Sequence, residues 1–527
     1  MDIEKIYPKC SNLLEAGLWR SLTDSPELAK NPEQFQKILT NDNKYKQLPD
    51  YISDLAQIEW TLFQIRSNPD LIPENISQLT VNPTLSILEL KWKRLADMFQ
   101  TSDVSHVQPE PGDEFLLIWY DPDTGKESVE PAASEELLVL KMIIEDIPAE
   151  VIAGAADVPI AAVDEAVERA AQKGLLLVPD TLIKRDPHFF SSGGPVDNQP
   201  MEAQVFTLQW HVTQACDLNC KHCYDRSDRS YPELAEGLRI LDEFRSFCRS
   251  RYVHGQVTFS GGNPLLYPYF KEIYRAASER GFTVAILGNP APEAQIKEIV
   301  QISHPSFYQV SLEGLQEHND YIRGPGHFKR VISFLEILKN LNIYSMVMLT
   351  LTKDNINQVL PLAEKLRNHT DHFTFNRLSQ VGEGANLVLP PRDEYRAFLK
   401  DYSEAARTNP VMGLKDNLFN ILRYENGMKS TGGCTGFGCG AAFNFLTLLP
   451  DGEVHACRKF PSLLGSVHDN SLADIYDSEL ARKYRSGSAS CNSCPIKPSC
   501  GGCMASAYSN GLDIFKERDP YCFICRS

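Results

Sequence analysis

The chain has 527 residues, of which 69 are acidic and 52 basic, so its formal net charge at pH 7 is −17. Its length predicts three or four domains of roughly 150 residues each, and the acidic excess argues against a nucleic-acid binder, whose phosphate contacts need clustered Lys and Arg. No apolar run reaches the roughly 18 residues of a membrane span, and the first residues lack the regions of a signal peptide. We therefore expect a cytoplasmic protein with neither a nucleic-acid nor a membrane partner.

Residues 1–105 are predicted to form a helical N-terminal region, because segments such as LPDYISDLAQIEWTLFQIRS place apolar residues at helical spacing. Residues 106–190 are predicted to form two strands joined by a turn (EFLLIWYDPDTGKESVEP), three helices and a returning strand (LLLVPD). This order predicts a winged helix-turn-helix, with a helical spacer as the alternative. Its helix AAVDEAVERAAQ has three acids against one Arg, which disfavours DNA binding.

The polar stretch 191–204 contains Gly and Pro and is predicted to be a linker. Over residues 205–385, helical segments alternate with six β-rich stretches: FTLQWHV, QVTFS, FTVAIL, FYQVSL, YSMVMLTL and HFTFNRL. Repeated strand–helix–strand units predict an α/β fold with a parallel sheet, and six units predict a partial (β/α)6 TIM barrel. Bridging helices are expected over 386–432 and a Cys-rich domain over 433–527.

The 14 cysteines are the most informative feature, because 12 of them fall in only two places. In a reducing compartment such clusters indicate metal binding or redox chemistry rather than disulfides. The first group, Cys216, Cys220 and Cys223, has the spacing C-x3-C-x2-C and follows the first barrel strand. Three thiolates can hold three irons of a four-iron cluster and leave the fourth iron open for reaction. A zinc site completed by His222 is the alternative.

This spacing resembles the hallmark of the radical S-adenosylmethionine (SAM) superfamily, in which an aromatic residue, here Tyr224, lies beside the last Cys. The resemblance implies that Cys216, Cys220 and Cys223 are catalytic ligands of a [4Fe-4S] cluster whose open iron binds SAM. It also implies that an electron from the cluster cleaves SAM to a 5′-deoxyadenosyl radical, which abstracts a hydrogen atom from the substrate.

Further matches to this superfamily follow at the predicted ends of later strands. The segment SGGNP stands where the family has GGEP, whose carbonyls contact the SAM amino group, and Asn263 departs from the usual Glu. In SLEG, Ser311 and Glu313 match residues that hold the ribose and the amino group, and Arg323 matches an Arg that meets the SAM carboxylate. Together with Tyr224, the SAM contacts implied by the resemblance are Gly261, Gly262, Asn263, Ser311, Glu313 and Arg323.

The C-terminal cysteines have the spacings C-x12-G-x4-C and C-x2-C-x5-C-x2-C, and LTLLPDGEVHAC is predicted to form two strands joined by an Asp-Gly turn. This pattern resembles the iron–sulfur (SPASM) extension of radical SAM peptide-modifying enzymes, although the family's last gap is usually x3. The resemblance implies two auxiliary four-iron clusters, with two zinc knuckles as the alternative. The implied ligands are Cys434, Cys439, Cys457 and Cys503 for the first, and Cys491, Cys494, Cys500 and Cys522, or Cys525 in place of Cys522, for the second.

These parts together imply an enzyme that modifies a ribosomally synthesised precursor peptide, using SAM and three [4Fe-4S] clusters. The chain most resembles maturases of the thio(seleno)oxazole-modification type, and its winged helix then resembles a domain that binds a leader peptide as an added strand on the hairpin edge. A flavodoxin- or ferredoxin-like reductant is expected.

Several alternatives stay open at this point. They are a peptide splicease, epimerase or thioether synthase, an anaerobic sulfatase maturase, and a metal-binding scaffold or regulator. Any barrel loop can supply the group that donates or accepts hydrogen, and the positional candidates are Tyr224, His211, Asn376 and Arg377.

Overall fold

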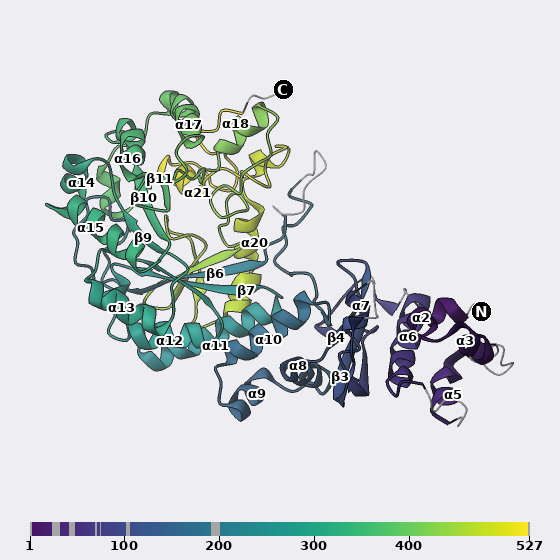
Figure 1. Ribbon diagram of the computed structural model, residues 1–527. Helices are drawn as coiled ribbons and strands as arrows, with labels where there is room; N and C mark the ends of the chain where they lie inside the picture. Colours follow the sequence, from purple (N-terminus) through teal and green to yellow (C-terminus); the bar gives the residue numbers. More distant parts are fainter. Residues whose placement is uncertain are drawn as a thin grey trace. The chain divides into compact units, whose positions relative to one another are not determined.

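The computed structural model describes residues 3–23, 32–41, 48–68, 71–73, 75–101, 106–190 and 201–524 (Figure 1). These residues form two compact units, Met1–Asp180 and Thr181–Ser527. None of the helices in the described ranges combines the length and the apolar composition that a membrane crossing needs. Most of the predicted linker (191–200) and Cys525 lie outside the described residues.

The first unit is built around a three-stranded antiparallel sheet. Its strands lie in the order β2 (Ser86–Lys93), β3 (Glu110–Asp121) and β4 (Lys126–Pro131). Successive residues of the central strand point to opposite faces, and both faces are covered. Leu116 and Ile118 belong to the hydrophobic cluster of the N-terminal helices, whereas Leu117 and Trp119 belong to the cluster of the helices that follow β4.

Helices before and after the sheet supply these two layers. Those before it are α1 (Ile3–Ile6), α2 (Pro8–Leu13), α3 (Ala16–Thr23), α5 (Phe35–Asn41), α6 (Ile52–Ser67) and, between β2 and β3, α7 (Asp97–Gln100). Those after it are α8 (Ser134–Ile144), α9 (Ala149–Ala156) and α10 (Ile160–Gln172). The hairpin and three helices predicted for residues 106–190 are therefore present.

The helical region predicted over residues 1–105 contains the expected helices but also two strands. In β2 (SILELKWK), Leu88, Leu90 and Trp92 alternate with charged residues, which is the period of a half-buried strand. This strand pairs with β3 and so occupies one edge of the predicted hairpin. The returning strand β5 (Leu176–Leu177) pairs with β1 (Thr80–Val81) rather than with the hairpin.

The second unit contains a nine-stranded sheet in the order β11-β10-β9-β8-β7-β6-β12-β13-β14. All six predicted barrel strands are confirmed, and each pairs in parallel with the next. They are β6 (Val205–Thr213), β7 (His254–Gly261), β8 (Thr283–Leu287), β9 (Tyr308–Ser311), β10 (Ser345–Leu351) and β11 (His372–Arg377).

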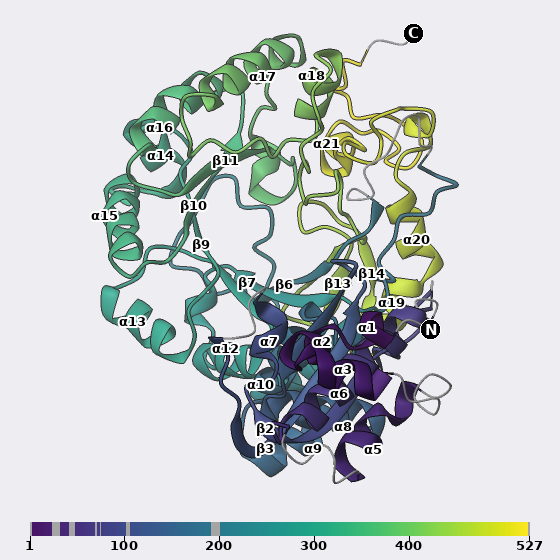
Figure 2. The same cartoon turned by 45° about the vertical axis from the view of Figure 1, so that its right-hand side comes forward.

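Helices connect these strands on the outer side of the curved sheet, as Figure 2 shows for α13, α15 and α16. Their bounds are α11 (Leu234–Ser250), α12 (Phe270–Glu279), α13 (Glu293–Ile302), α14 (Gln316–Arg323), α15 (His327–Asn340) and α16 (Val359–Leu366). The region predicted to hold bridging helices contains α17 (Arg392–Ala406) and α18 (Phe419–Glu425). Because the connections run on the outside, the ends of the parallel strands stay open to form a site.

The Cys-rich region extends the barrel sheet. Its first strand, β12 (Phe445–Leu448), pairs in parallel with β6, and β13 (Glu453–His455) and β14 (Leu463–Ser466) follow in antiparallel order. The predicted turn between β12 and β13 is confirmed, and Gly452 adopts a φ of 87°, which favours glycine. The remaining helices are α19 (Leu472–Asp477), α20 (Glu479–Ser486) and α21 (Met504–Ser509). One hydrophobic core runs through the barrel and this region.

Candidate active site

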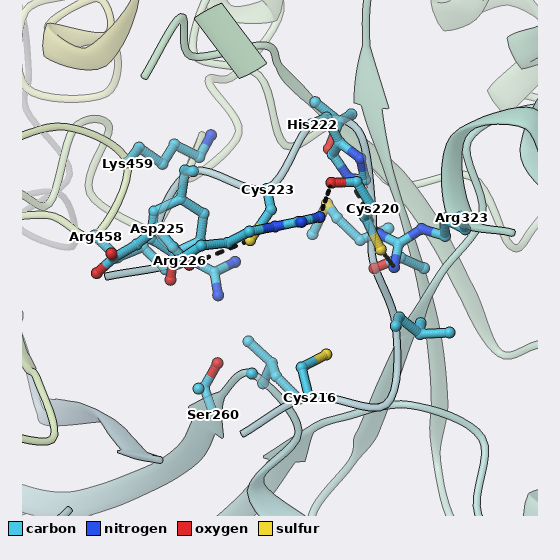
Figure 3. Close-up of a pocket in the computed structure, with 18 of the residues that line it drawn as sticks. Cys216, Cys220, His222, Cys223, Asp225, Arg226, Ser260, Arg323, Arg458 and Lys459 are labelled. Carbon is cyan, nitrogen blue, oxygen red and sulfur yellow. Dashed lines mark hydrogen bonds between the residues drawn. The ribbon is translucent and has the colours of Figure 1, made fainter. Parts of the chain in front are cut away.

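A cavity of about 430 Å³ lies where the barrel strands end (Figure 3). This volume is within the range of about 300–1,000 Å³ typical of small-molecule sites. Eight of the predicted cluster or SAM residues line it: Cys216, Cys220, Cys223, Tyr224, Gly261, Gly262, Ser311 and Arg323. Asn263 and Glu313 do not line it, because they are buried behind its wall. The site also includes residues that sequence analysis missed, among them Asn289, Arg458 and Lys459.

The cysteine loop follows β6 and is fixed by polar contacts from the end of β8 and the end of α14. Asn289, after β8, donates through Nδ2 to Asp217 Oδ1 at 2.6 Å and lies 3.6 Å from Cys216 Sγ. Arg323, at the end of α14, places Nη1 3.7 Å from Cys220 Sγ. The contacts with Cys216 and Cys220 direct an N–H group toward sulfur, which favours the charged form of the thiol. The three cysteines are at least partly exposed and thus accessible to a ligand.

The glycine turn after β7 forms the part of the wall that approaches the backbone of the cysteine loop most closely. A Cβ on Gly261, which has a φ of 140°, would lie 2.2 Å from Thr213 O, and one on Gly262 would lie 2.3 Å from Ala215 O. The Gly262 N–H donates to Thr213 O at 2.9 Å, so the two segments are bonded as well as packed. No side chain larger than hydrogen fits at either position without moving the loop.

The contacts of Asn263 explain why this position does not hold the Glu that the family resemblance implies. Its Nδ2 donates to Asp217 Oδ1 at 3.0 Å, and its side chain is almost fully buried. A Glu at this position would place a second carboxylate against that of Asp217 and could not donate the bond. The amide therefore suits this loop.

Glu313 and Arg323 form a buried ion pair. Glu313 Oε1 accepts from Arg323 Nε at 2.9 Å and Nη2 at 2.6 Å, while Oε2 accepts from the Thr350 N–H at 2.8 Å. Burial alone would raise the pKa of Glu313, but His222 and Arg323 beside it hold the pKa well below its ordinary value. The carboxylate is thus charged and faces Arg323 rather than the cavity.

His211 and Tyr224 form a buried pair beside the cavity. The Tyr224 hydroxyl lies 3.1 Å from His211 Nε2. Burial lowers the pKa of His211 to about 3, with Arg458 as the next contribution, and burial raises the pKa of Tyr224. The imidazole is neutral at physiological pH and does not line the cavity. It therefore orients the tyrosine rather than acting as an acid on substrate.

Arg377 lines the cavity, but its guanidinium is already fully engaged. It donates to Asp416 through Nε at 2.9 Å and to Asp519 through Nη1 and Nη2 at 2.8 and 2.6 Å. Asp519 in turn accepts from the Cys503 N–H at 2.9 Å. Since arginine does not give up a proton in proteins, this residue links β11 to the Cys-rich region and is a poor candidate for hydrogen transfer. Asn376 lines the cavity beside it.

The C-terminal cysteines lie in two groups. Burial raises the pKa of Cys439, and the adjacent Cys503, Cys434 and Cys457 raise it further, so these four thiols are neighbours. A second, smaller cavity is lined by Cys491, Cys494, Cys500 and Cys522. The two groups have the membership that the resemblance implied, with Cys525 outside the described residues.

Sets of three and four cysteine thiols suit iron–sulfur clusters, whose irons bind soft thiolate ligands. All cysteines that the structure describes are free thiols. In the same ranges, no three His, Cys, Asp or Glu side chains are arranged to hold a single metal ion.

Comparison with known proteins identifies both parts of the second unit. Residues 210–366 match the model of the Radical SAM superfamily, and residues 439–504 match that of SPASM, an iron-sulfur cluster-binding domain. These two regions of the chain resemble a radical SAM domain and a SPASM domain. These domains imply iron–sulfur clusters and SAM as cofactors. The fold is accordingly a radical SAM α/β partial barrel followed by a SPASM domain.

Three relatives of the chain are named for different products. It is 28% identical over 348 residues to the AdoMet-dependent heme synthase of Methanosarcina barkeri, covering 60% of this chain and 95% of that protein. It is 26% identical over 325 residues to the antilisterial bacteriocin subtilosin biosynthesis protein AlbA of Bacillus subtilis, covering 58% and 68%. It is 28% identical over 333 residues to the mycofactocin maturase MftC of Mycolicibacterium smegmatis, covering 60% and 82%.

Among solved structures, Streptococcus suis SuiB bound to precursor peptide SuiA has a TM-score of 0.50 at 17% identity. The match covers 78% of this chain and 96% of that chain. At this identity the likeness concerns the fold.

Proposed function

We propose that this chain is a radical SAM enzyme that cleaves SAM reductively and modifies a ribosomally synthesised precursor peptide, with the thio(seleno)oxazole type as its nearest resemblance. The observation that carries the radical step is the convergence of Cys216, Cys220, Cys223, the glycine turn and Arg323 on one cavity at the strand ends. Two of the relatives, AlbA and MftC, are named for bacteriocin biosynthesis and for a maturase, which supports a peptide-derived substrate.

Each group of cavity residues has a different proposed role. Cys216, Cys220 and Cys223 would hold a [4Fe-4S] cluster, and the glycine turn offers backbone groups to SAM at close approach. Arg323, held in place by Glu313, keeps Nη1 directed at the thiol of Cys220. When bound, the cluster and SAM supply a 5′-deoxyadenosyl radical for hydrogen abstraction. The protein orients the substrate and limits water around it.

The two C-terminal cysteine groups would each hold a further [4Fe-4S] cluster, so that the holoenzyme has three. Full ligation of two auxiliary clusters needs eight thiols, and the two groups supply eight. Of these eight thiols, Cys500 is buried and the other seven are partly exposed, so each group is accessible to iron and sulfide. We expect a flavodoxin- or ferredoxin-like protein to deliver the electron.

The first unit would bind the leader of the precursor as an added strand. In the described sheet, β2 and β4 are the edge strands, since β3 is paired on both sides. In the predicted hairpin of β3 and β4, only β4 lies at an edge of the described sheet. The α10 helix, with its acidic residues, does not suit a nucleic-acid groove.

The radical step is tested by measuring 5′-deoxyadenosine formed from SAM by the anaerobically reconstituted chain with dithionite. We expect product from the native chain and none when Cys216, Cys220 and Cys223 are all replaced by Ala. The Cys248→Ala variant is the matched control, because that cysteine is buried in the barrel core away from the cavity. Retention of product in the triple variant would overturn the assignment.

The peptide step is tested by mass spectrometry of candidate precursor peptides co-expressed with the chain. A mass change that requires residues 1–180 would support leader binding, whereas SAM cleavage should persist in a chain of residues 181–527. The heme synthase relative makes a tetrapyrrole substrate the second candidate, favoured by the 95% coverage of that protein. A porphyrin substrate converted without any peptide product would replace our proposal.

A further inference from the structure

Arg458 and Lys459 enter the cavity from the SPASM domain, directly after Cys457. We call these two residues the cation pair. Figure 3 shows them on the side of the view opposite Arg323 and His222. The substrate cavity is therefore bounded by barrel residues on one side and by two basic side chains of the Cys-rich region on the other.

The turn that carries the cation pair is held rigidly. The Cys457 N–H donates to Ser462 Oγ at 3.1 Å, and the Ser462 hydroxyl donates to Cys457 O at 2.9 Å. The Ser379 hydroxyl, after β11, donates to the Lys459 carbonyl at 2.5 Å. The Ser379 bond ties the backbone of the turn to the barrel, and the Ser462 bonds hold its shape, so the Cα atoms of the cation pair have a defined position at the cavity wall.

Charge in the cavity is strongly unbalanced. Its charged lining residues are Arg226, Arg323, Arg377, Arg458, Lys459 and Asp225. Two of these arginines, Arg323 and Arg377, are paired with buried carboxylates, and Asp225 lies 3.4 Å from Arg229 Nε. Within the part of the chain that the structure describes, neither side chain of the cation pair has a hydrogen-bond or ion-pair partner.

Lys459 offsets part of the rise that burial gives to the pKa of Cys457 and Cys503, so its charge also acts on these thiols. Two further observations concern the charge of the cation pair. The chain as a whole has a formal charge of −17, so its composition does not by itself lead us to expect unpaired cations in the cavity. The pKa of His211 is lowered by burial and, next in size, by Arg458, so the positive field reaches the neighbouring side chains.

We propose that the cation pair binds a carboxylate of the substrate and so fixes which hydrogen faces the reacting centre. The guanidinium of Arg458 fits a carboxylate in the bidentate manner, and the Lys459 ammonium adds a point charge. The carboxylate belongs either to an acidic side chain near the modified residue or to a C-terminus. This assignment rests on the proposed function, namely that the cavity accepts a peptide.

The test uses the reconstituted full-length chain with SAM and measures binding of blocked pentapeptides, acetyl-Gly-Gly-Glu-Gly-Gly-amide and its Gln counterpart. Acetyl-pentaglycine with a free or an amidated C-terminus distinguishes the two sources of carboxylate. We expect the native chain to prefer one carboxylate peptide over its neutral partner by about tenfold or more, as charged hydrogen bonds allow. The preference should fall to about one in Arg458→Gln and Lys459→Gln, and it should be reduced but not lost in Arg458→Lys, which keeps the charge without the bidentate geometry.

Lys297→Gln, on the exposed α13, is the control and should leave the preference unchanged. SAM affinity, iron and sulfide content and peptide-free 5′-deoxyadenosine formation are measured on every variant, so that failure of the radical step is seen separately. Equal binding of charged and neutral peptides by the native chain overturns the proposal. So does a loss of SAM affinity or of iron in Arg458→Gln with the peptide preference intact, because the cation would then serve SAM or the Cys457 thiolate instead.

Discussion

Replacing Arg377 by Met should destabilise the second unit far more than an exposed arginine would. The side chains of Arg377, Asp416 and Asp519 are 3%, 6% and 1% exposed, and the guanidinium is the cation between the two carboxylates. Methionine retains the length of the side chain and its contacts with aromatic neighbours but leaves two buried carboxylates facing each other. Breaking a buried pair in this way costs about 3–5 kcal/mol.

The assay is urea unfolding of the metal-free chain under reducing conditions, followed by circular dichroism. Arg407→Met is the matched control, since Arg407 and Glu404 are 67% and 74% exposed and such pairs contribute about 0–1 kcal/mol. Adding Asp519→Asn to Arg377→Met should recover part of the loss, because it removes one uncompensated charge. If Arg377→Met lowers the free energy of unfolding no more than Arg407→Met does, the buried pair does not hold the barrel to the Cys-rich region.

Three further predictions concern the cavity wall. Gly262→Ala should abolish detectable SAM binding in calorimetry, because its Cβ would lie 2.3 Å from Ala215 O; unchanged affinity would contradict the close approach. Asn263→Glu should lower the midpoint of thermal unfolding, because it sets a carboxylate against Asp217, whereas Asn263→Gln should cost less; equal midpoints would count against that contact. For Glu313, burial raises the pKa, but the lowering by His222 and Arg323 is larger than this rise. The net pKa is therefore below its ordinary value of 4.5. Its charge therefore stabilises the fold above that pH and does so less as pH falls, and the stability difference between native and Glu313→Gln chains should shrink from pH 7 to pH 3 in urea titrations.

The sequence was sufficient for features that depend on local pattern. The barrel strands are short stretches that contain β-branched and aromatic residues, and the C-x3-C-x2-C loop after the first stretch falls at a strand end, as a parallel sheet requires. The same reasoning applies to β2, in which Leu88, Leu90 and Trp92 alternate with charged residues. The helical periodicity of the preceding residues does not continue into this strand.

Features that depend on packing between distant segments could not be read in this way. Nothing in the local sequence shows that Glu313 turns away from the cavity to pair with Arg323, because that choice depends on the Thr350 N–H of the next strand. Likewise, Asn289 and Asn263 meet at Asp217 only because β7 and β8 end beside the cysteine loop. The cation pair directly follows Cys457, a predicted ligand. Only the fold shows that this turn faces the cavity.

The pairing of β12 with β6 means that the barrel has no free edge on that side. A chain ending before residue 433 would leave the row of backbone N–H and C=O groups on β6 unpaired, and such an edge invites association with other chains. The barrel and the Cys-rich region are thus expected to fold as one cooperative body, and loading the C-terminal thiols with iron would stabilise the barrel as well. Attempts to produce the catalytic barrel alone should yield aggregates, whereas removal of the first 180 residues should not.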